Sequence, residues 1–95
     1  MKELLEKILV ELKKQKALYL EFYSNIDKEE QINFVDYRIK MHGIQLENLE
    51  KEKYQNFTET ELGSFGLKKD QLQYALDVYI HQNEQIKKDS KYKLF

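Results

Sequence analysis

The sequence contains no cysteine, no proline and no tryptophan, and only three glycines. Without cysteine the chain can form no disulfide, no thiolate metal site and no cysteine nucleophile. Without proline no helix is interrupted by a missing backbone donor. No apolar run approaches the ~18 residues that a membrane span requires, and the charges along the N-terminal segment are unlike the apolar core of a signal peptide. These absences favour a helical, cytoplasmic protein with no membrane partner.

What the chain does contain is a high content of charged and apolar residues in a short length. Its 95 residues are 41% hydrophobic and 35% charged, with a formal net charge of −1. This size and composition are typical of a single all-α domain built as a helical bundle with coiled-coil-like packing. Of the 16 basic residues, only Arg38 is an arginine. Because arginine reads guanine and phosphate bidentately, this ratio weighs against specific binding of nucleic acid.

Apolar residues recur at helical spacing in three long segments, which predict helices at residues 2–23, 28–54 and 68–88. Only a few residues join the first two, so we expect a long antiparallel hairpin followed by a third helix. The three helices form one domain over residues 1–88, and a basic tail follows at 89–95. The first helix presents one stripe to the core: Leu5, Ile8, Leu12, Gln15, Tyr19 and Phe22. The third helix turns inward Leu72, Ala75, Leu76, Tyr79 and Ile86, with a weaker stripe of Tyr74, Val78 and His81 on its opposite side.

The segment between the second and third helices contains the turn signals of the chain. Thr58 and Glu61 have the spacing of a capping box, which predicts a single helical turn at residues 59–63. Gly63 and Gly66 then allow a positive φ. We expect the apolar side chains of this segment to pack under the end of the bundle: Phe57, Phe65 and Leu67.

The second helix is apolar on two opposite faces. One stripe faces the core and consists of Ile32, Val35, Ile39, His42, Leu46 and Leu49. The other consists of Phe34, Tyr37, Met41 and Ile44, and it begins about 200° around the helix from Ile32. A helix with two opposed apolar faces needs a neighbour on each side. Because the spacing continues in register past Gly43, we favour one continuous helix over two helices separated by a C-terminal glycine.

Two arrangements would cover this second stripe. The third helix could cover it within the monomer, which would give a plain three-helix bundle. We favour the alternative, in which a second copy of the chain or another protein covers it, because long helices leave the monomer with a thin core that dimerisation would repair. Exposed aromatic and methionine side chains are typical of interaction hot spots. The predicted partner-binding residues are Phe34, Tyr37, Arg38, Met41 and Ile44, with Arg38 placed to anchor an acidic partner.

The main alternative is a helix-turn-helix DNA-binding regulator that uses residues 60–80. This stretch has a short helix, a glycine turn and a second helix. The residues that would then face DNA are Lys68, Lys69, Gln71, Gln73 and Tyr74. However, Leu62 stands where such units place a small residue, and the acidic side chains of Asp70 and Asp77 on the same helix would repel phosphates.

No group of residues predicts catalysis, a metal site or a cofactor. His42 lies in the core stripe, where a hydrogen-bonded core imidazole is the expected role, and His81 has no acid on its own face. The serines fall at helix ends, where capping explains them. We therefore expect a non-enzymatic interaction module without a small-molecule substrate. By size and composition alone, it suits a small regulatory, immunity or inhibitory adaptor of the kind that bacteria, phages or mobile elements encode.

Overall fold

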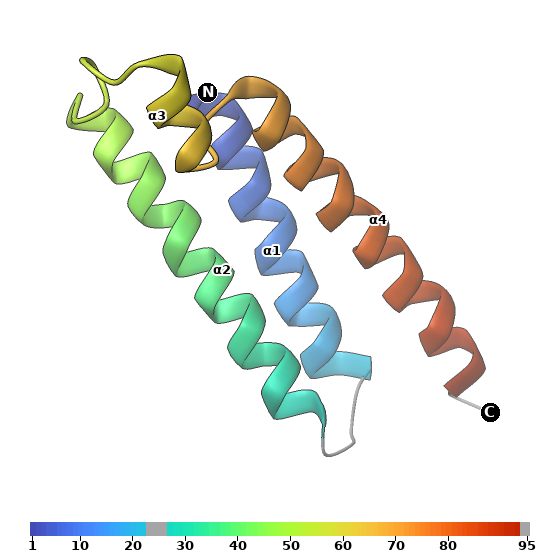
Figure 1. Cartoon of the computed structure of the whole chain (residues 1–95). Coiled ribbons are helices and arrows are strands. Elements are labelled where there is room, and N and C mark those ends of the chain that lie inside the picture. The colour runs from blue at the N-terminus through green and yellow to red at the C-terminus, as the bar shows by residue number, and fades with distance from the viewer. Residues whose placement is uncertain (23–26, 94–95) are drawn as a thin grey trace.

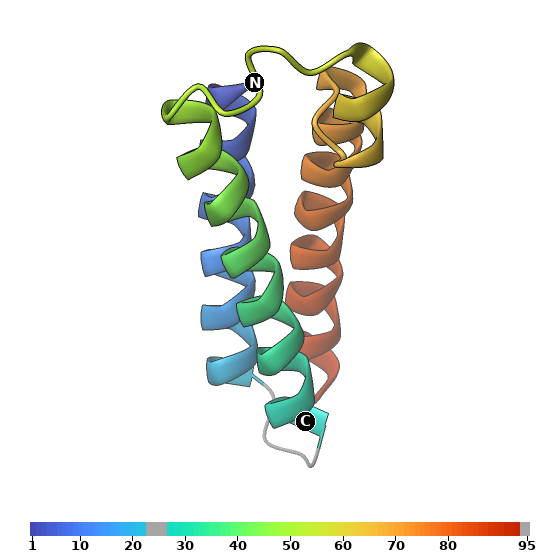
Figure 2. The same ribbon diagram turned by 60° about the vertical axis from the view of Figure 1, so that its left-hand side comes forward.

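The computed structural model describes the backbone of residues 1–22 and 27–93, and the side chains of residues 1–21 and 28–88. These residues form four helices and no strand: α1 (Lys2–Phe22), α2 (Asp27–Glu50), α3 (Glu59–Ser64) and α4 (Lys69–Lys93). Figure 1 shows the long helices α1, α2 and α4, with the short α3 at one end. The predicted all-α architecture is confirmed: α1 and α2 form an antiparallel hairpin (Figure 2), and α4 is the third long helix. The hairpin connection at residues 23–26 lies outside the described residues.

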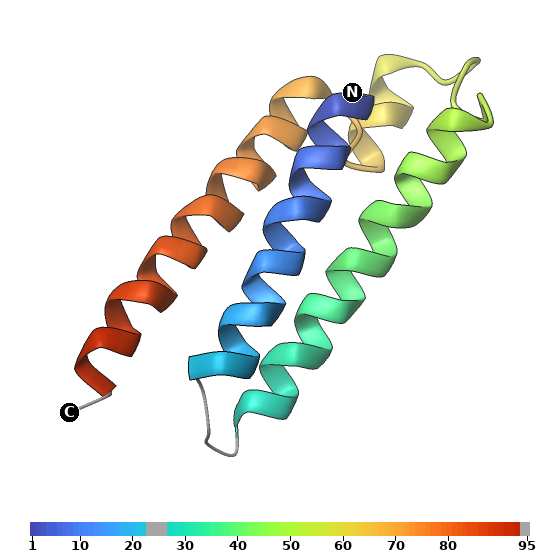
Figure 3. The same ribbon diagram turned by 180° about the vertical axis from the view of Figure 1, so that it is seen from behind.

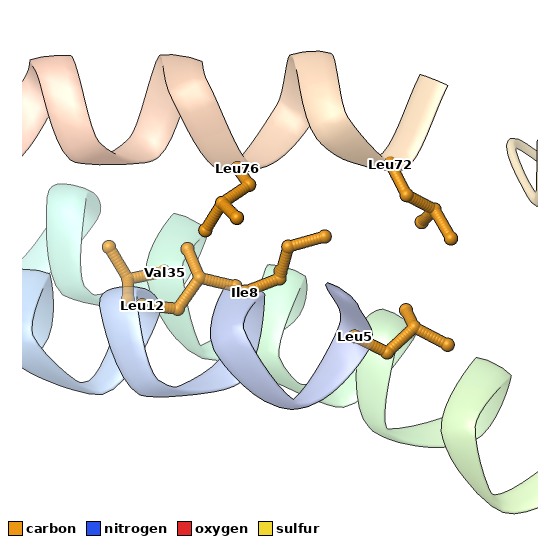
Figure 4. Close-up of a cluster of buried hydrophobic side chains, with 6 residues drawn as sticks. All are labelled: Leu5, Ile8, Leu12, Val35, Leu72 and Leu76. Atoms are coloured by element: carbon orange, nitrogen blue, oxygen red, sulfur yellow. The ribbon is translucent and has the colours of Figure 1, made fainter. Parts of the chain in front are cut away.

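The core of the bundle lies along α1, because this helix packs against both α2 and α4. Its side chains Leu5, Ile8 and Leu12 are fully buried. Figure 4 shows how one residue of α2 and two of α4 meet them: Val35, Leu72 and Leu76. The molecule extends over 54 × 20 × 19 Å with a radius of gyration of 15.3 Å. A compact domain of this length has a radius of gyration of about 13 Å, so the molecule is elongated.

A polar layer interrupts this core between α1 and α4. Gln15 is fully buried, and its Nε2 donates to Oε1 of Gln82 at 3.1 Å. Asn83 is also buried, and its Nδ2 donates to the backbone oxygen of Glu11 at 2.9 Å and to the carboxylate of Glu11 at 3.0 Å. The remaining side-chain oxygens, Gln15 Oε1 and Asn83 Oδ1, are buried without a partner. The sequence pattern predicted the inward position of Gln15 but missed Asn83.

The ends of the long helices differ from the predicted ones. The α2 helix runs unbroken through Gly43, as predicted, but it ends at Glu50 and not at Tyr54. The backbone of Glu52 adopts a φ of +57°, which a right-handed helix cannot accommodate. Helix α4 continues to Lys93, five residues beyond the predicted end at Lys88, so the first part of the expected basic tail is helical.

The α3 helix has the local hydrogen bonds that its sequence predicts. Both bonds of the capping box between Thr58 and Glu61 are present. At the other end, the amide of Leu67 donates to Leu62 O at 2.8 Å and that of Gly66 to Gly63 O at 3.2 Å, which is a Schellman motif. Gly66 has the φ of +70° that this motif requires.

The apolar residues around α3 pack less completely than expected. Leu67 is fully buried under the end of the bundle, as predicted, and Phe57 is partly buried. The prediction for Phe65 is wrong, because its side chain is 57% exposed. Its ring lies against that of Phe57, at a centroid distance of 5.7 Å.

Candidate interaction surface

The second apolar stripe of α2 is exposed to solvent. The exposed fractions are 52% for Phe34, 62% for Tyr37, 43% for Met41 and 43% for Ile44. A large apolar or aromatic residue presents about 200 Å² in full, so these fractions leave about 400 Å² of side-chain surface open. This is within the range of the largest apolar patches on monomeric proteins, which are often functional. We name these four residues the α2 stripe.

No other helix of the described chain covers the α2 stripe. The third long helix, α4, packs along α1, and few backbone positions of α4 approach α2 closely. The intramolecular arrangement in which the third helix covers this stripe is therefore wrong. At the N-terminal end of the stripe, an open depression is lined by Glu30, Asn33, Phe34 and Tyr37.

Arg38 lies beside the α2 stripe, on the flank that faces α4. Its guanidinium carbon sits 5.8 Å from the centre of the Tyr79 ring, which is cation–π geometry. Its side chain is half-buried, and no carboxylate among the described residues pairs with it. Burial raises the pKa of Tyr79, and the Arg38 charge partly offsets this increase. Arg38 is therefore held in place by an aromatic face while the hydrogen-bond donors of its guanidinium remain available.

A hydrogen-bond network beneath Arg38 joins α2 to α4. His42 Nδ1 lies 2.8 Å from Gln45 Oε1, and His42 Nε2 lies 3.1 Å from the hydroxyl of Tyr79. Gln45 Nε2 donates to the backbone oxygen of Phe65 at 2.8 Å, which fixes the orientation of the Gln45 amide. Gln45 Oε1 therefore faces His42 and accepts a hydrogen bond from His42 Nδ1–H. In the neutral imidazole with its proton on Nδ1, His42 Nε2 accepts a hydrogen bond from the Tyr79 hydroxyl. The prediction that His42 is a core imidazole bonded to a neighbour is confirmed.

The environment of His42 also favours its neutral form. Burial lowers the pKa of His42 from its usual value of 6.5, the hydrogen bond to Gln45 opposes this change, and the Arg38 charge lowers the pKa further.

Some of the side chains that would contact DNA in the alternative function already form hydrogen bonds to nearby residues of the chain. Gln71 accepts from the backbone amide of Lys68 at 3.2 Å, and its Nε2 donates to Gly63 O at 3.1 Å. Gln73 donates to Asp77 at 3.0 Å. Only two members of this set have fully free exposed side chains in the described part of the chain: Lys69 and Tyr74.

The described residues contain no group of three or more histidine, aspartate or glutamate side chains that could hold a metal ion. None of the helices in this part of the chain combines the length and the hydrophobicity that crossing a bilayer demands. Comparison with protein-family models, with curated proteins and with solved structures finds no match.

Proposed function

We propose that this protein is a non-catalytic protein–protein interaction module of the cytoplasm, which acts as a small regulatory, immunity or inhibitory adaptor. Its contact surface is the α2 stripe together with Arg38, and its partner is a second copy of the chain or another protein. The observation that carries the proposal is the α2 stripe itself, because four large apolar side chains share one helix face that the rest of the described chain leaves open.

The chemistry of this surface supports the proposal. Interface centres are enriched in Tyr, Phe, Met and Arg and depleted in Lys and Glu, and the stripe with Arg38 has that composition. An arginine that is already ordered on an aromatic ring loses little side-chain entropy when it binds a partner. A surface of this kind binds by occupying another protein rather than by chemical turnover.

The proposal is tested by comparing Met41→Asp with a matched variant, Val10→Asp. Val10 is also an exposed apolar residue, 53% exposed, but it lies on α1. Light scattering gives the mass of the assembly, and affinity capture from an extract of the native host gives the bound proteins. We expect Met41→Asp to dissociate the assembly or to lose the captured protein, and Val10→Asp to retain both.

Two results would contradict the proposal. The first is that Met41→Asp leaves the assembly mass and the captured proteins unchanged. The second is salt-sensitive retention on duplex DNA that neutralisation of Lys68 and Lys69 abolishes, which would identify the DNA-binding alternative.

A further inference from the structure

One side of the α2/α4 pair has no long helix over it, and only the short α3 lies at its upper end, where Gln45 and Gln71 donate to backbone oxygens of Phe65 and Gly63. In Figure 3 α1 lies in front, whereas in Figure 1, seen from the opposite side, no long helix passes in front of α2 and α4. The contacts of Tyr79 with His42 and Arg38 place the middle of α4 beside the middle of α2. A four-helix bundle has this arrangement when one of its four helices is removed.

The residues on this open side follow from helix geometry. On α2, Asp36 pairs with Lys16 of α1 at 2.8 Å, and Phe34 and Met41 lie about 160° and 140° around the helix from Asp36. They therefore lie on the flank turned away from α1. The row at heptad spacing on this flank is Phe34, Arg38, Met41 and Gln45. On α4, Asn83 bonds to α1, and the row that lies about 80–160° around the helix from it, on the side of Tyr79 and α2, is Gln71, Ala75, Val78, Gln82 and Gln85. Gln82 lies at the inner edge of this row, where it also accepts a hydrogen bond from Gln15 of α1. We name these two rows the open face.

The open face has an unusual charge content for this chain. More than one residue in three of the whole sequence is charged, yet the nine positions of the open face contain a single charge, Arg38, and no acid. Asp36 of α2 pairs with Lys16 of α1, and the acid nearest to the open face is Glu30, which lines the depression beside Phe34 at the N-terminal end of α2. A partner on the open face therefore meets an apolar and amide surface with one cation near its middle.

Arg38 requires a carboxylate that the described chain does not supply. Arg38 is partly buried, and its guanidinium lies over the Tyr79 ring and forms no ion pair within the described residues. A partner that covered it without an acid would bury an uncompensated charge, which is strongly unfavourable. A partner with a carboxylate at this point would form a bidentate, charge-assisted pair.

A second copy of the chain does not meet this requirement. A two-fold axis through the middle of the α2 stripe would place Arg38 beside Arg38 of the other copy, and Lys40 beside Lys40 on the opposite flank. A shift along the helix that separates these charges would leave part of the stripe uncovered. The stripe also offers only about 400 Å² on each copy, whereas a stable interface buries about 800 Å² on each partner.

Resting on the proposed function, we infer that the open face is the docking site for an amphipathic helix of another protein, with a carboxylate beside its apolar stripe that pairs with Arg38. Such a helix takes the place of the fourth helix of the bundle. Its apolar stripe covers Phe34 and Met41 of α2 and Val78 of α4.

The test uses two synthetic amphipathic helices of equal length with the same leucine stripe, one with glutamate and the other with lysine beside the stripe. Fluorescence anisotropy measures their binding to the wild-type chain, to Arg38→Glu and to Lys13→Glu. Lys13→Glu is the matched control, because it makes the same change in net charge at an exposed position of α1. We expect the wild-type chain to bind the glutamate-flanked helix about tenfold more tightly than the lysine-flanked one.

The preference should reverse in Arg38→Glu, disappear in the neutral Arg38→Gln, and persist in Lys13→Glu. Because the chain has a net charge of −1, non-specific attraction would favour the lysine-flanked helix and cannot produce the expected order. Equal affinities for the two helices, or a preference that Arg38→Glu leaves unchanged, would overturn the inference. Self-association of the chain that Met41→Asp abolishes, without binding of either helix, would also overturn it but would leave the proposed function intact.

Discussion

Replacing Gln15 by methionine should stabilise the protein, although it removes a hydrogen bond from the core. Gln15 is fully buried, its Nε2 forms one bond to Gln82, and its Oε1 has no partner. Methionine has a similar length and helix propensity, and its flexible chain adapts to the space between α1 and α4. The substitution therefore changes the polarity of this position with little change in shape.

The magnitude follows from two opposing terms. Loss of the bond to Gln82 costs about 1 kcal/mol, because Gln82 is only partly buried and can bind water instead. Relief of the unpartnered Oε1 returns about 1–3 kcal/mol, and burial of a fully apolar side chain adds to this gain. We expect a net increase of about 1–2 kcal/mol in the free energy of unfolding, which raises the melting temperature by about 4–8 °C per kcal/mol in a domain of this size.

Thermal and urea unfolding followed by circular dichroism would measure this change. The control is Gln85→Met, because Gln85 is exposed on α4 and its replacement should change stability by less than about 0.5 kcal/mol. A lower melting temperature for Gln15→Met than for the wild type would refute the reasoning. It would mean that Gln15 contributes more to the pairing of α1 with α4 than its contacts account for.

Three further predictions concern the turns and the network around His42. Gly43→Ala should raise the free energy of unfolding by about 1 kcal/mol, because a Cβ at this mid-helix position meets open space. Gly66→Ala should lower the free energy of unfolding by about 1–2 kcal/mol, because the φ of this residue is +70°. Equal effects of the two substitutions in urea melts would contradict this expected difference. Thr58→Ala should speed hydrogen exchange at the amide of Glu61, whose acceptor it removes, by about tenfold. Because the pKa of His42 is lowered below 6.5 in the folded state, the unfolded state binds the proton more readily, so stability is full above pH 6.5 and decreases as the pH falls below it. His42→Gln should flatten this decrease in pH-dependent urea melts, and an unchanged slope would show that other groups cause it.

The inward stripes could be predicted from the sequence because each depends only on spacing within one helix. The positions of Leu5, Ile8 and Leu12 repeat at intervals of three and four residues, and all three are fully buried. Asn83 falls on the corresponding row of α4, but a search for apolar residues passes over it. A stricter use of the spacing, without regard to residue type, would have found it, as it found Gln15.

The ends of the helices were predicted less well, since they depend on contacts that spacing does not contain. After Leu49, the last apolar residue of its stripe, α2 has nothing further to pack against the core, and it ends one residue later. No glycine or proline marks this end; the left-handed conformation falls on Glu52, a residue with no strong preference for it. By contrast, the ends of α3 carry their own signals. The capping box at Thr58 was predicted, and of the two glycines named for a positive φ, Gly66 adopts it whereas Gly63 lies within the helix.

The open face has its origin in the width of the apolar surface of α1. Leu4 and Leu9 flank the buried stripe of α1 and extend its apolar arc over about 140°, which exceeds the arc that a single neighbour covers. Both α2 and α4 therefore dock on α1, and between themselves they share mainly the contacts of Tyr79 with His42 and Arg38. The two apolar faces of α2 indicated that a neighbour is needed on each face. Because the apolar surface of α1 is wide enough to hold both α2 and α4, α4 packs on α1 and leaves the second face of α2 uncovered. Under the proposed function we expect the second neighbour of α2 to be another protein, and we expect Arg38, which forms no ion pair among the described residues, to select the charge of that partner.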